Sequence, residues 1–166
     1  MPFFSDIESK IQSNDQMVQT IARWRAAGDT IVFTNGCFDL LHYGHLHYLA
    51  AARDLGNRLV VGLNSAESVR RLKGPARPIN DEATRTHSLA ALEMVDAVVV
   101  FEADTPLDLI ERLQPDVLVK GGDWKPEQIV GSETVRSRGG QVLSLPFVEG
   151  YSTTNIEQKI LNKAGH

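Results

Sequence analysis

The sequence predicts a doubly wound α/β fold, in which helices cover both faces of one parallel sheet. After Gly28, short and almost wholly apolar β-branched runs alternate with longer segments of helical periodicity. Strands that are apolar throughout are buried on both faces, and strands joined by helices are normally parallel with right-handed crossovers. The length of 166 residues and the hydrophobic content of 42% suit one domain with an ordinary core. We therefore expect a single Rossmann-like domain built on a five-stranded parallel sheet.

The first 28 residues are expected to form a helical extension that precedes the α/β domain at residues 29–166. They contain two capping boxes, in which a serine and a Glu or Gln three residues later satisfy free N–H groups at a helix start. These are Ser5-x-x-Glu8 and Ser13-x-x-Gln16. The second box precedes apolar residues at helical spacing, and Gly28 ends that pattern. A short helix followed by an amphipathic helix is therefore predicted.

Five strands and five helices are expected in the remainder. The strands are predicted at residues 30–34, 58–63, 97–101, 117–120 and 141–145. Four helices are predicted near residues 44–55, 65–72, 81–94 and 106–113, the last with Thr105 as its cap and Pro106 as its first residue. A final helix is predicted to start near residues 152–154. Ligands bind such sheets outside the carboxyl ends of the strands, where the chain order reverses. The candidate site therefore comprises the segments that follow strands: TNGCFD, NSAES, GGDW and EGYSTT.

Composition narrows the class of protein. A formal net charge of −4 gives no electrostatic footprint for nucleic acid or for an anionic membrane surface. The single cysteine, Cys37, excludes an internal disulfide and fits a reducing compartment. No apolar run approaches the length of a membrane span, and MPFFSDIESK lacks the blocks of a signal peptide. We expect a cytoplasmic protein that binds neither nucleic acid nor a membrane.

Three histidines, His42, His45 and His47, follow the first predicted strand. In a helix that begins near His42, the first two lie about 60° apart and His47 about 140° from either, so only two share a face. A zinc site would need further ligands at suitable spacing, and none is evident. We therefore predict no metal site built from protein ligands, and expect His47 to pack or to face solvent.

The turn that carries His42 and His45 is predicted to bind phosphate. Gly36 and Gly44 bracket a strand-to-helix junction, where backbone can approach a ligand and free helix N–H groups point toward it. Two imidazoles one turn apart can donate hydrogen bonds to phosphoryl oxygens, and they add positive charge if protonated. The chain contains neither G-x-x-x-x-G-K-[ST] nor G-x-G-x-x-G after a strand. A P-loop kinase and a usual dinucleotide-binding protein are therefore disfavoured.

The stretch from Gly36 to His45, GCFDLLHYGH, resembles the signature of the cytidylyltransferase-like nucleotidyltransferases, whose H-x-G-H motif here is His42-Tyr43-Gly44-His45. The resemblance continues in RTHSL, KGGDW and GYSTTNI and spans residues 30–160. Within that family, TNGCFDLLHYGH, LNSAESVRRLKGPARPI and PDVLVKGGDW are most similar to the adenylyltransferases of ADP-heptose synthesis. The resemblance implies a nucleotidyltransferase domain at residues 29–166. It also implies transfer of AMP from ATP to D-glycero-β-D-manno-heptose 1-phosphate, giving ADP-heptose and pyrophosphate for the lipopolysaccharide core.

The same resemblance implies the partners and cofactor. Mg²⁺ is expected on the triphosphate of ATP, held mostly by the nucleotide and water. No kinase domain fits this sequence, so a functional link to a separate heptose kinase is expected, together with a homo-oligomeric state. Two alternatives stay open. One is a CTP-dependent cytidylyltransferase acting on glycerol phosphate or another polyol phosphate, and the other is a nucleotide-sensing module without turnover.

His42 and His45 are the expected catalytic pair. The expected nucleotide-binding residues follow strands or open helices: Thr34, Asn35, Gly36, Cys37, Phe38, Gly44, His45, Lys120, Gly121, Gly122, Asp123, Ser152, Thr153 and Thr154. The paired glycines could instead form only a turn, and the Ser/Thr run could serve only as a helix cap. Many family members carry an arginine one turn after the S-T motif, whereas Asn155-Ile156-Glu157-Gln158-Lys159 follows here, so Lys159 is left outside the site.

The expected acceptor-binding residues are Asp39, Asn64, Lys73, Arg77 and Arg85. A sugar phosphate that attacks a triphosphate needs cations to offset the repulsion between the two anions, and KGPARP places cations on a loop restricted by proline and glycine. The alternatives are structural. Asp39 could cap the following helix, Asn64 could cap the helix at residues 65–72, and the three cations could form a solvated basic face.

Overall fold

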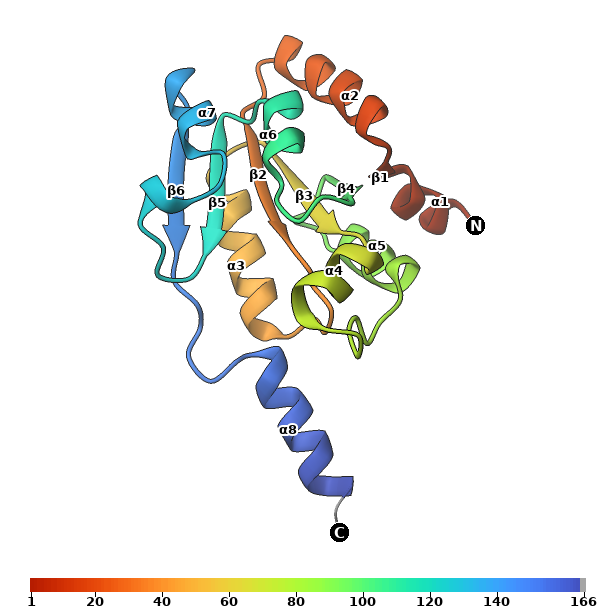
Figure 1. Ribbon diagram of the computed structural model, residues 1–166. Coiled ribbons are helices and arrows are strands. Elements are labelled where there is room, and N and C mark those ends of the chain that lie inside the picture. Colours follow the sequence, from red (N-terminus) through yellow and green to blue (C-terminus); the bar gives the residue numbers. More distant parts are fainter. Residues whose placement is uncertain (165–166) are drawn as a thin grey trace.

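The computed structural model, which describes residues 1–164, contains one parallel sheet with the strand order β1-β4-β3-β2-β5-β6 (Figure 1). Every neighbouring pair of strands is parallel, which confirms the doubly wound α/β prediction. The sheet has six strands where five were predicted. They are β1 (Ile11–Gln12), β2 (Ile31–Gly36), β3 (Arg58–Asn64), β4 (Ala97–Phe101), β5 (Val117–Gly121) and β6 (Gln141–Leu145).

The additional strand, β1, comes from the N-terminal segment. Ile11 and Gln12 pair with Val98 and Val99 of β4 at one edge of the sheet. Two residues are too few to show the period-two alternation by which a strand is predicted. The first 28 residues thus contribute a strand to the sheet, and the division of the chain after residue 28 stays a proposal.

The helices follow the predicted order with shifted ends. They are α1 (Pro2–Ser9), α2 (Asn14–Ala26), α3 (Tyr43–Arg53), α4 (Ala66–Lys73), α5 (Glu82–Ala90), α6 (Leu107–Leu113), α7 (Ser132–Ser137) and α8 (Thr153–Ala164), with a 3-10 turn at Pro126–Gln128. The helix predicted at residues 81–94 ends at Ala90. Neither the 3-10 turn nor α7 was predicted, because three and six residues are too short for a clear 3.6-residue pattern.

Of the three helix starts predicted from the caps Ser5, Ser13 and Thr105, two are wrong and one is confirmed. Ser13 forms the predicted capping box: its hydroxyl accepts from the Gln16 N–H, and its own N–H donates to the Gln16 side chain. Ser5 instead lies inside α1, where its N–H already donates to the Met1 carbonyl. α6 begins at Leu107, with Pro106 at the cap position and no side-chain cap from Thr105.

Buried apolar residues form a core on each face of the sheet. α2, α6 and α7 cover one face, where Met17, Ile21 and Ile110 pack on Phe33. α3 and α5 cover the other face, where Leu49 and Leu89 pack on the opposite side chains of the same strands. The carboxyl ends of the strands are left free for a site.

The chain order reverses beside β2. From β2 the chain moves outward through β3 to β4, and it then returns to β5 on the other side of β2. The switch point therefore lies between the carboxyl ends of β2 and β5, as a doubly wound sheet requires for a ligand site. α8 extends away from the domain at this end of the sheet (Figure 1). In residues 1–164, no helix is long and apolar enough to cross a membrane.

Candidate active site

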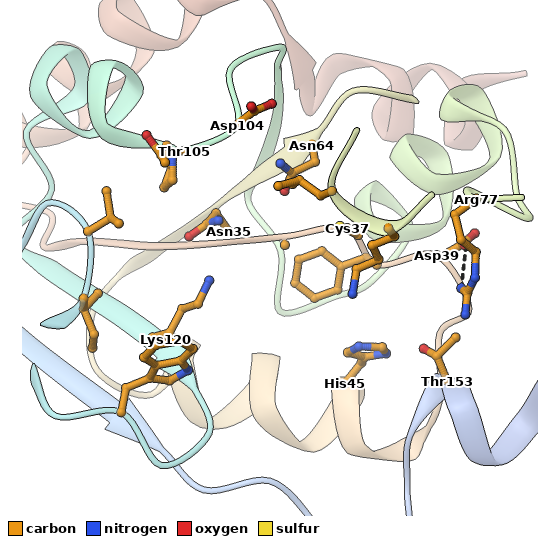
Figure 2. A pocket seen from close by; sticks show the side chains of 18 of the residues that line it. Asn35, Cys37, Asp39, His45, Asn64, Arg77, Asp104, Thr105, Lys120 and Thr153 are labelled. Atoms are coloured by element: carbon orange, nitrogen blue, oxygen red, sulfur yellow. Dashed lines mark hydrogen bonds and ion pairs between the residues drawn. The ribbon is translucent and has the colours of Figure 1, made fainter. Parts of the chain in front are cut away.

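A cavity of about 470 Å³ opens at the switch point (Figure 2). Its wall comes from the carboxyl ends of β2, β3 and β5 and the segments after β2, β4 and β5. The start of α3, the end of α4, the loop after α4 and the first turn of α8 complete it. Predicted site residues on its wall are Asn35, Gly36, Cys37, Phe38, Asp39, His45, Asn64, Lys73, Arg77, Lys120, Thr153 and Thr154. The fold therefore brings together in one cavity twelve of the residues that were proposed for the two substrates.

A second cavity of about 220 Å³ lies beside the first. It is more aromatic, with walls from Tyr48, Phe147 and Tyr151, and the predicted residues His42, Gly44 and Ser152 also line it. Two residues, His45 and Thr153, line both cavities. The shared wall is therefore the place where groups bound in the two cavities would meet.

His42 and His45 share one face of the start of α3, as their spacing predicts. His42 is the N-cap residue, and its ring stacks on that of His45 with the centroids 3.9 Å apart. Within residues 1–164, the Nδ1 atoms of both rings are buried without a hydrogen-bond partner. Gly44 permits this arrangement, because a Cβ there would lie 3.0 Å from the His42 ring and 3.2 Å from the Cβ of Tyr151.

Both imidazoles are neutral at pH 7 in the ligand-free protein. Burial, and secondarily the nearby His42, lowers the pKa of His45 to about 4. Burial also lowers the pKa of His42 from its ordinary value. The pair therefore offers N–H donors without a formal charge, and the predicted option of additional positive charge requires an anion that stabilises the imidazolium. His47 is exposed and lies outside both cavities.

Lysines supply the positive charge of the main cavity. The Lys120 side chain reaches into the cavity from the end of β5 (Figure 2), and Lys73 lines it from the end of α4. Burial, together with the charge of Lys73, lowers the pKa of Lys120. Burial raises the pKa of the Cys37 thiol despite the cations around it, so Cys37 is a neutral part of the wall.

Arg77 lines the main cavity, but carboxylates occupy both ends of its guanidinium. Nη1 donates to Asp39 Oδ2 at 2.9 Å, and Nη2 donates to Glu157 Oε2 at 2.5 Å. Asp39 also accepts from the N–H groups of Ile79 and Asn80, each at 2.8 Å. Burial opposes ionisation of Asp39, but these donors outweigh it and hold its pKa below the ordinary value. Asp39 therefore anchors the KGPARP loop and does not cap α3.

Arg85 lies beneath the site and not on its wall. It is 1% exposed, and its Nη1 donates to the carbonyl oxygens of Cys37 and Asn64 at 3.0 and 2.8 Å. Arg85 lines neither cavity, so its position gives no support to the predicted direct contact with substrate. The guanidinium instead joins the ends of β2 and β3. Asn64 is not the cap of α4, which is Ser65; its amide donates to Ser68 Oγ at 3.0 Å.

Four other predicted nucleotide-binding residues lie outside both cavities. The Thr34 hydroxyl is buried against the Tyr48 hydroxyl at 2.5 Å. Gly121 and Gly122 lie under Phe147, where added Cβ atoms would come within 2.8 and 3.0 Å of its ring. Asp123 is exposed. Ser152 does cap the first turn of α8, accepting from Asn155 N at 3.1 Å, and it also lines the second cavity.

Several wall residues were not predicted. Asp104 and Thr105 follow β4, and Gln128 follows β5; Trp124, which was expected to form wall and not a stacking platform, also lines the cavity. The first two had an available signal, because they stand directly after a strand at the edge where the other candidates gather. In the second cavity, Tyr151 lies in the predicted segment EGYSTT, whereas Tyr48 of α3 and Phe147 of the loop before α8 had no such signal.

Metal-ligating side chains are sparse in the part of the chain that the structure describes. Residues 1–164 contain no group of three or more His, Cys, Asp or Glu placed to hold an ion. The two carboxylates on the main cavity, Asp39 and Asp104, are paired with Arg77 and Arg71. This donor set suits a cation that arrives on a nucleotide, because phosphate and water oxygens can supply most of its ligands.

The sequence is similar to those of known proteins. The family model described as cytidylyltransferase-like matches residues 33–159. The bifunctional protein HldE of Trichlorobacter lovleyi is 56% identical over 158 residues, which are 95% of this chain and 32% of that protein. HldE of Geobacter metallireducens is 56% identical over 97% of this chain and 33% of that protein. The chain thus spans about a third of the length of these relatives.

A solved structure is also similar. The crystal structure of the lipopolysaccharide core biosynthesis protein from Thermoplasma volcanium GSS1 has a TM-score of 0.60 and 29% identity, covering 75% of this chain and all of that one. The family match covers residues 33–159, which include the H-x-G-H turn and most of the wall of the switch-point cavity. The chain belongs to the cytidylyltransferase-like family.

Proposed function

We propose that this chain is a nucleotidyltransferase that transfers AMP from ATP to D-glycero-β-D-manno-heptose 1-phosphate, releasing pyrophosphate and ADP-heptose. The family match and the resemblance to adenylyltransferases of ADP-heptose synthesis support the reaction class. The names of the relatives support the pathway, since one is a lipopolysaccharide core biosynthesis protein and the others are bifunctional HldE proteins. A heptose kinase that supplies the acceptor, a cytoplasmic location and a homo-oligomeric state belong to the same proposal.

The observation that carries the proposal is the wall shared by the two cavities. The smaller cavity has aromatic walls suited to a nucleobase, and the larger has amides, hydroxyls and lysines suited to the phosphates of ATP and to a sugar phosphate. A nucleotidyl transfer needs its two substrates to meet at the α-phosphorus. His45 and Thr153 line both cavities, which supports a meeting point of the two substrates beside them.

The chemistry is an in-line displacement. A phosphate oxygen of the sugar phosphate forms a bond to the α-phosphorus of ATP, and the bond from that phosphorus to the bridging oxygen breaks to release pyrophosphate. A phosphate monoester is anionic at neutral pH, so the enzyme needs no general base and no covalent intermediate. Catalysis therefore consists of positioning and of stabilising the charge that builds on the phosphoryl oxygens.

Different protein groups bind and stabilise different parts of the two substrates. His42 and His45 donate neutral N–H bonds to the α-phosphoryl oxygens, and the first turns of α3 and α8 add backbone N–H groups. Lys73 and Lys120 offset the repulsion between the two anions. Thr153 and Thr154 hold the leaving phosphates. Mg²⁺ bound by the triphosphate would neutralise charge on the leaving group, and the wall offers it few free protein ligands.

Product analysis tests the proposal. The chain should release pyrophosphate with ATP, Mg²⁺ and the heptose 1-phosphate, and mass spectrometry should find ADP-heptose among products from a panel of sugar 1-phosphates. Faster release with CTP and glycerol phosphate would support the cytidylyltransferase alternative. Saturable ATP binding without product under any acceptor would support the nucleotide-sensing alternative.

A further inference from the structure

α8 reaches away from the domain, and only its first turn lies at the active site (Figure 1). Thr153 and Thr154 line the main cavity, whereas Ile160 and Leu161, farther along the helix, are 59% and 70% exposed. The helix is therefore not fixed by burial of an apolar face. Something else must hold its first turn against the cavity.

One ion pair joins the body of α8 to the domain. In residues 1–164, the hydrogen bonds of α8 run within the helix or to the loop just before it, apart from the bond that Glu157 accepts from Arg77. That loop, between β6 and α8, contains Gly150, whose φ of +85° lies in the region that favours glycine. Its Tyr151 packs on Tyr43 of α3, with the ring centroids 5.0 Å apart. The loop therefore holds the start of α8 beside α3, and the pair of Arg77 and Glu157 fixes the next turn.

Arg77 is a rigid connection at the other end. Its side chain is 17% exposed, between Asp39 at 4% and Glu157 at 31%. Asp39 is fixed in turn by the N–H groups of Ile79 and Asn80. A planar guanidinium with a carboxylate at each end loses little further freedom, and bonds between charged groups are stronger than neutral ones. A continuous set of bonds therefore joins α8 to the loop after β2.

We propose that Glu157 is a positioning residue, which acts through Arg77 to hold the first turn of α8 at the phosphate end of the active site. The inference rests on the proposed function and deepens it. In this proposal Arg77 does not bind the acceptor phosphate. It connects Asp39 to Glu157 by hydrogen bonds at both ends of its guanidinium. Glu157 lies one helical turn after Thr153, so the same helix carries a residue of the cavity wall and the carboxylate end of the connection.

A double-mutant cycle tests the proposal with Glu157→Gln, Arg77→Gln and the double variant. Glu149→Gln is the matched control, because Glu149 is exposed in the loop before α8. We expect Glu157→Gln to raise the KM for ATP roughly tenfold, as expected for loss of a charge-assisted contact. The KM for ATP of the double variant should be no higher than that of Arg77→Gln alone. The KM of the control should equal that of the wild type. Non-additivity of this kind identifies two residues that act as one unit.

Hydrogen exchange of the ligand-free protein gives a second readout that does not depend on activity. Amides of residues 153–163 should exchange at least about fivefold faster in Glu157→Gln than in Glu149→Gln, with unchanged exchange in β2 and β3. The inference is overturned if α8 exchange and the KM for ATP are unchanged in Glu157→Gln. It is also overturned if that variant lowers the KM for the sugar phosphate, because an Arg77 released from Glu157 would then be binding the acceptor. Absence of ATP turnover in the wild type would overturn the proposed function instead, while the exchange result would still decide the connection.

Discussion

At the scale of single residues, His45 combines properties that neither a metal ligand nor a packing residue needs. Its ring lines both cavities and stacks on His42, and its Nδ1 has no partner within the described chain. A buried polar atom without a partner costs free energy in the empty protein. An incoming phosphoryl oxygen that accepts from this pair would remove that cost at the moment of binding or reaction.

His45→Ala should lower kcat by about 10²–10³, because a preorganised donor to developing charge is worth that much. ATP affinity should fall much less, since only interactions that strengthen in the transition state accelerate the chemical step. His47→Ala is the control, because His47 is exposed on the same helix. Steady-state kinetics, ATP titration and metal analysis of each folded variant make the measurement. A kcat within about threefold of wild type would exclude His45 as a principal stabiliser of the transition state.

His45 also predicts a pH dependence of stability. Its pKa is about 4 in the folded protein and 6.5 when unperturbed. Between these values the unfolded chain binds a proton that the folded chain does not, so the free energy of unfolding falls as pH drops from 6.5 to 4. The slope is at most about 1.4 kcal/mol per pH unit. Above pH 6.5 this contribution is fully present and constant.

Urea unfolding of the ligand-free wild type and of His45→Gln measures that contribution, because the variant lacks the titrating group while other groups cancel in the difference. The wild type should lose stability relative to the variant between pH 6.5 and 4. Parallel curves across this range would show that burial does not depress the pKa of His45.

At the scale of elements, the same sequence signal had two different outcomes. Ser5-x-x-Glu8 and Ser13-x-x-Gln16 both match a capping box, yet only Ser13 is extended before a helix, with φ −68° and ψ 162°. Pro2 begins α1 three residues before Ser5, so the Ser5 N–H already has a partner. A local motif indicates a possible helix start, but the position of the preceding break decides whether it is used.

Ser13→Ala should therefore lower the free energy of unfolding by about 1 kcal/mol, the typical cost of losing an N-cap. Ser5→Ala should change it by less than about 0.5 kcal/mol, as is usual for a surface position without such a role. Chemical denaturation of both variants beside the wild type makes the comparison. A loss below about 0.5 kcal/mol in Ser13→Ala as well would mean that the Ser13 box adds nothing to the stability of α2.

At the scale of the whole molecule, the sequence predicted the parts of the site that depend on strand ends. A residue at the carboxyl end of a buried parallel strand, or directly after it, has its location fixed by the sheet, which is why Asn35, Cys37, Asn64 and Lys120 all reach the main cavity. Partnerships between distant segments had no such signal. Two examples are the ion pair of Arg77 with Glu157 and the hydrogen bonds from Arg85 to the carbonyl groups of Cys37 and Asn64. These contacts depend on tertiary packing, which the periodicity of the sequence does not encode.

The two-cavity arrangement predicts that substrate affinities can be changed separately. Phe147 lines only the smaller cavity and Thr105 only the larger of the two. Phe147→Ala removes an aromatic wall, and a base stacked on an aromatic side chain is stabilised by about 1–3 kcal/mol, so the KM for ATP should rise about fivefold or more. Thr105→Val keeps the side-chain shape and removes a hydroxyl, so it should raise the KM for the sugar phosphate and leave that for ATP within about twofold. Initial rates with each substrate varied in turn measure both. If Phe147→Ala raised only the KM for the sugar phosphate, the smaller cavity would bind the sugar phosphate and the larger cavity the nucleobase. His45 would still lie between the two.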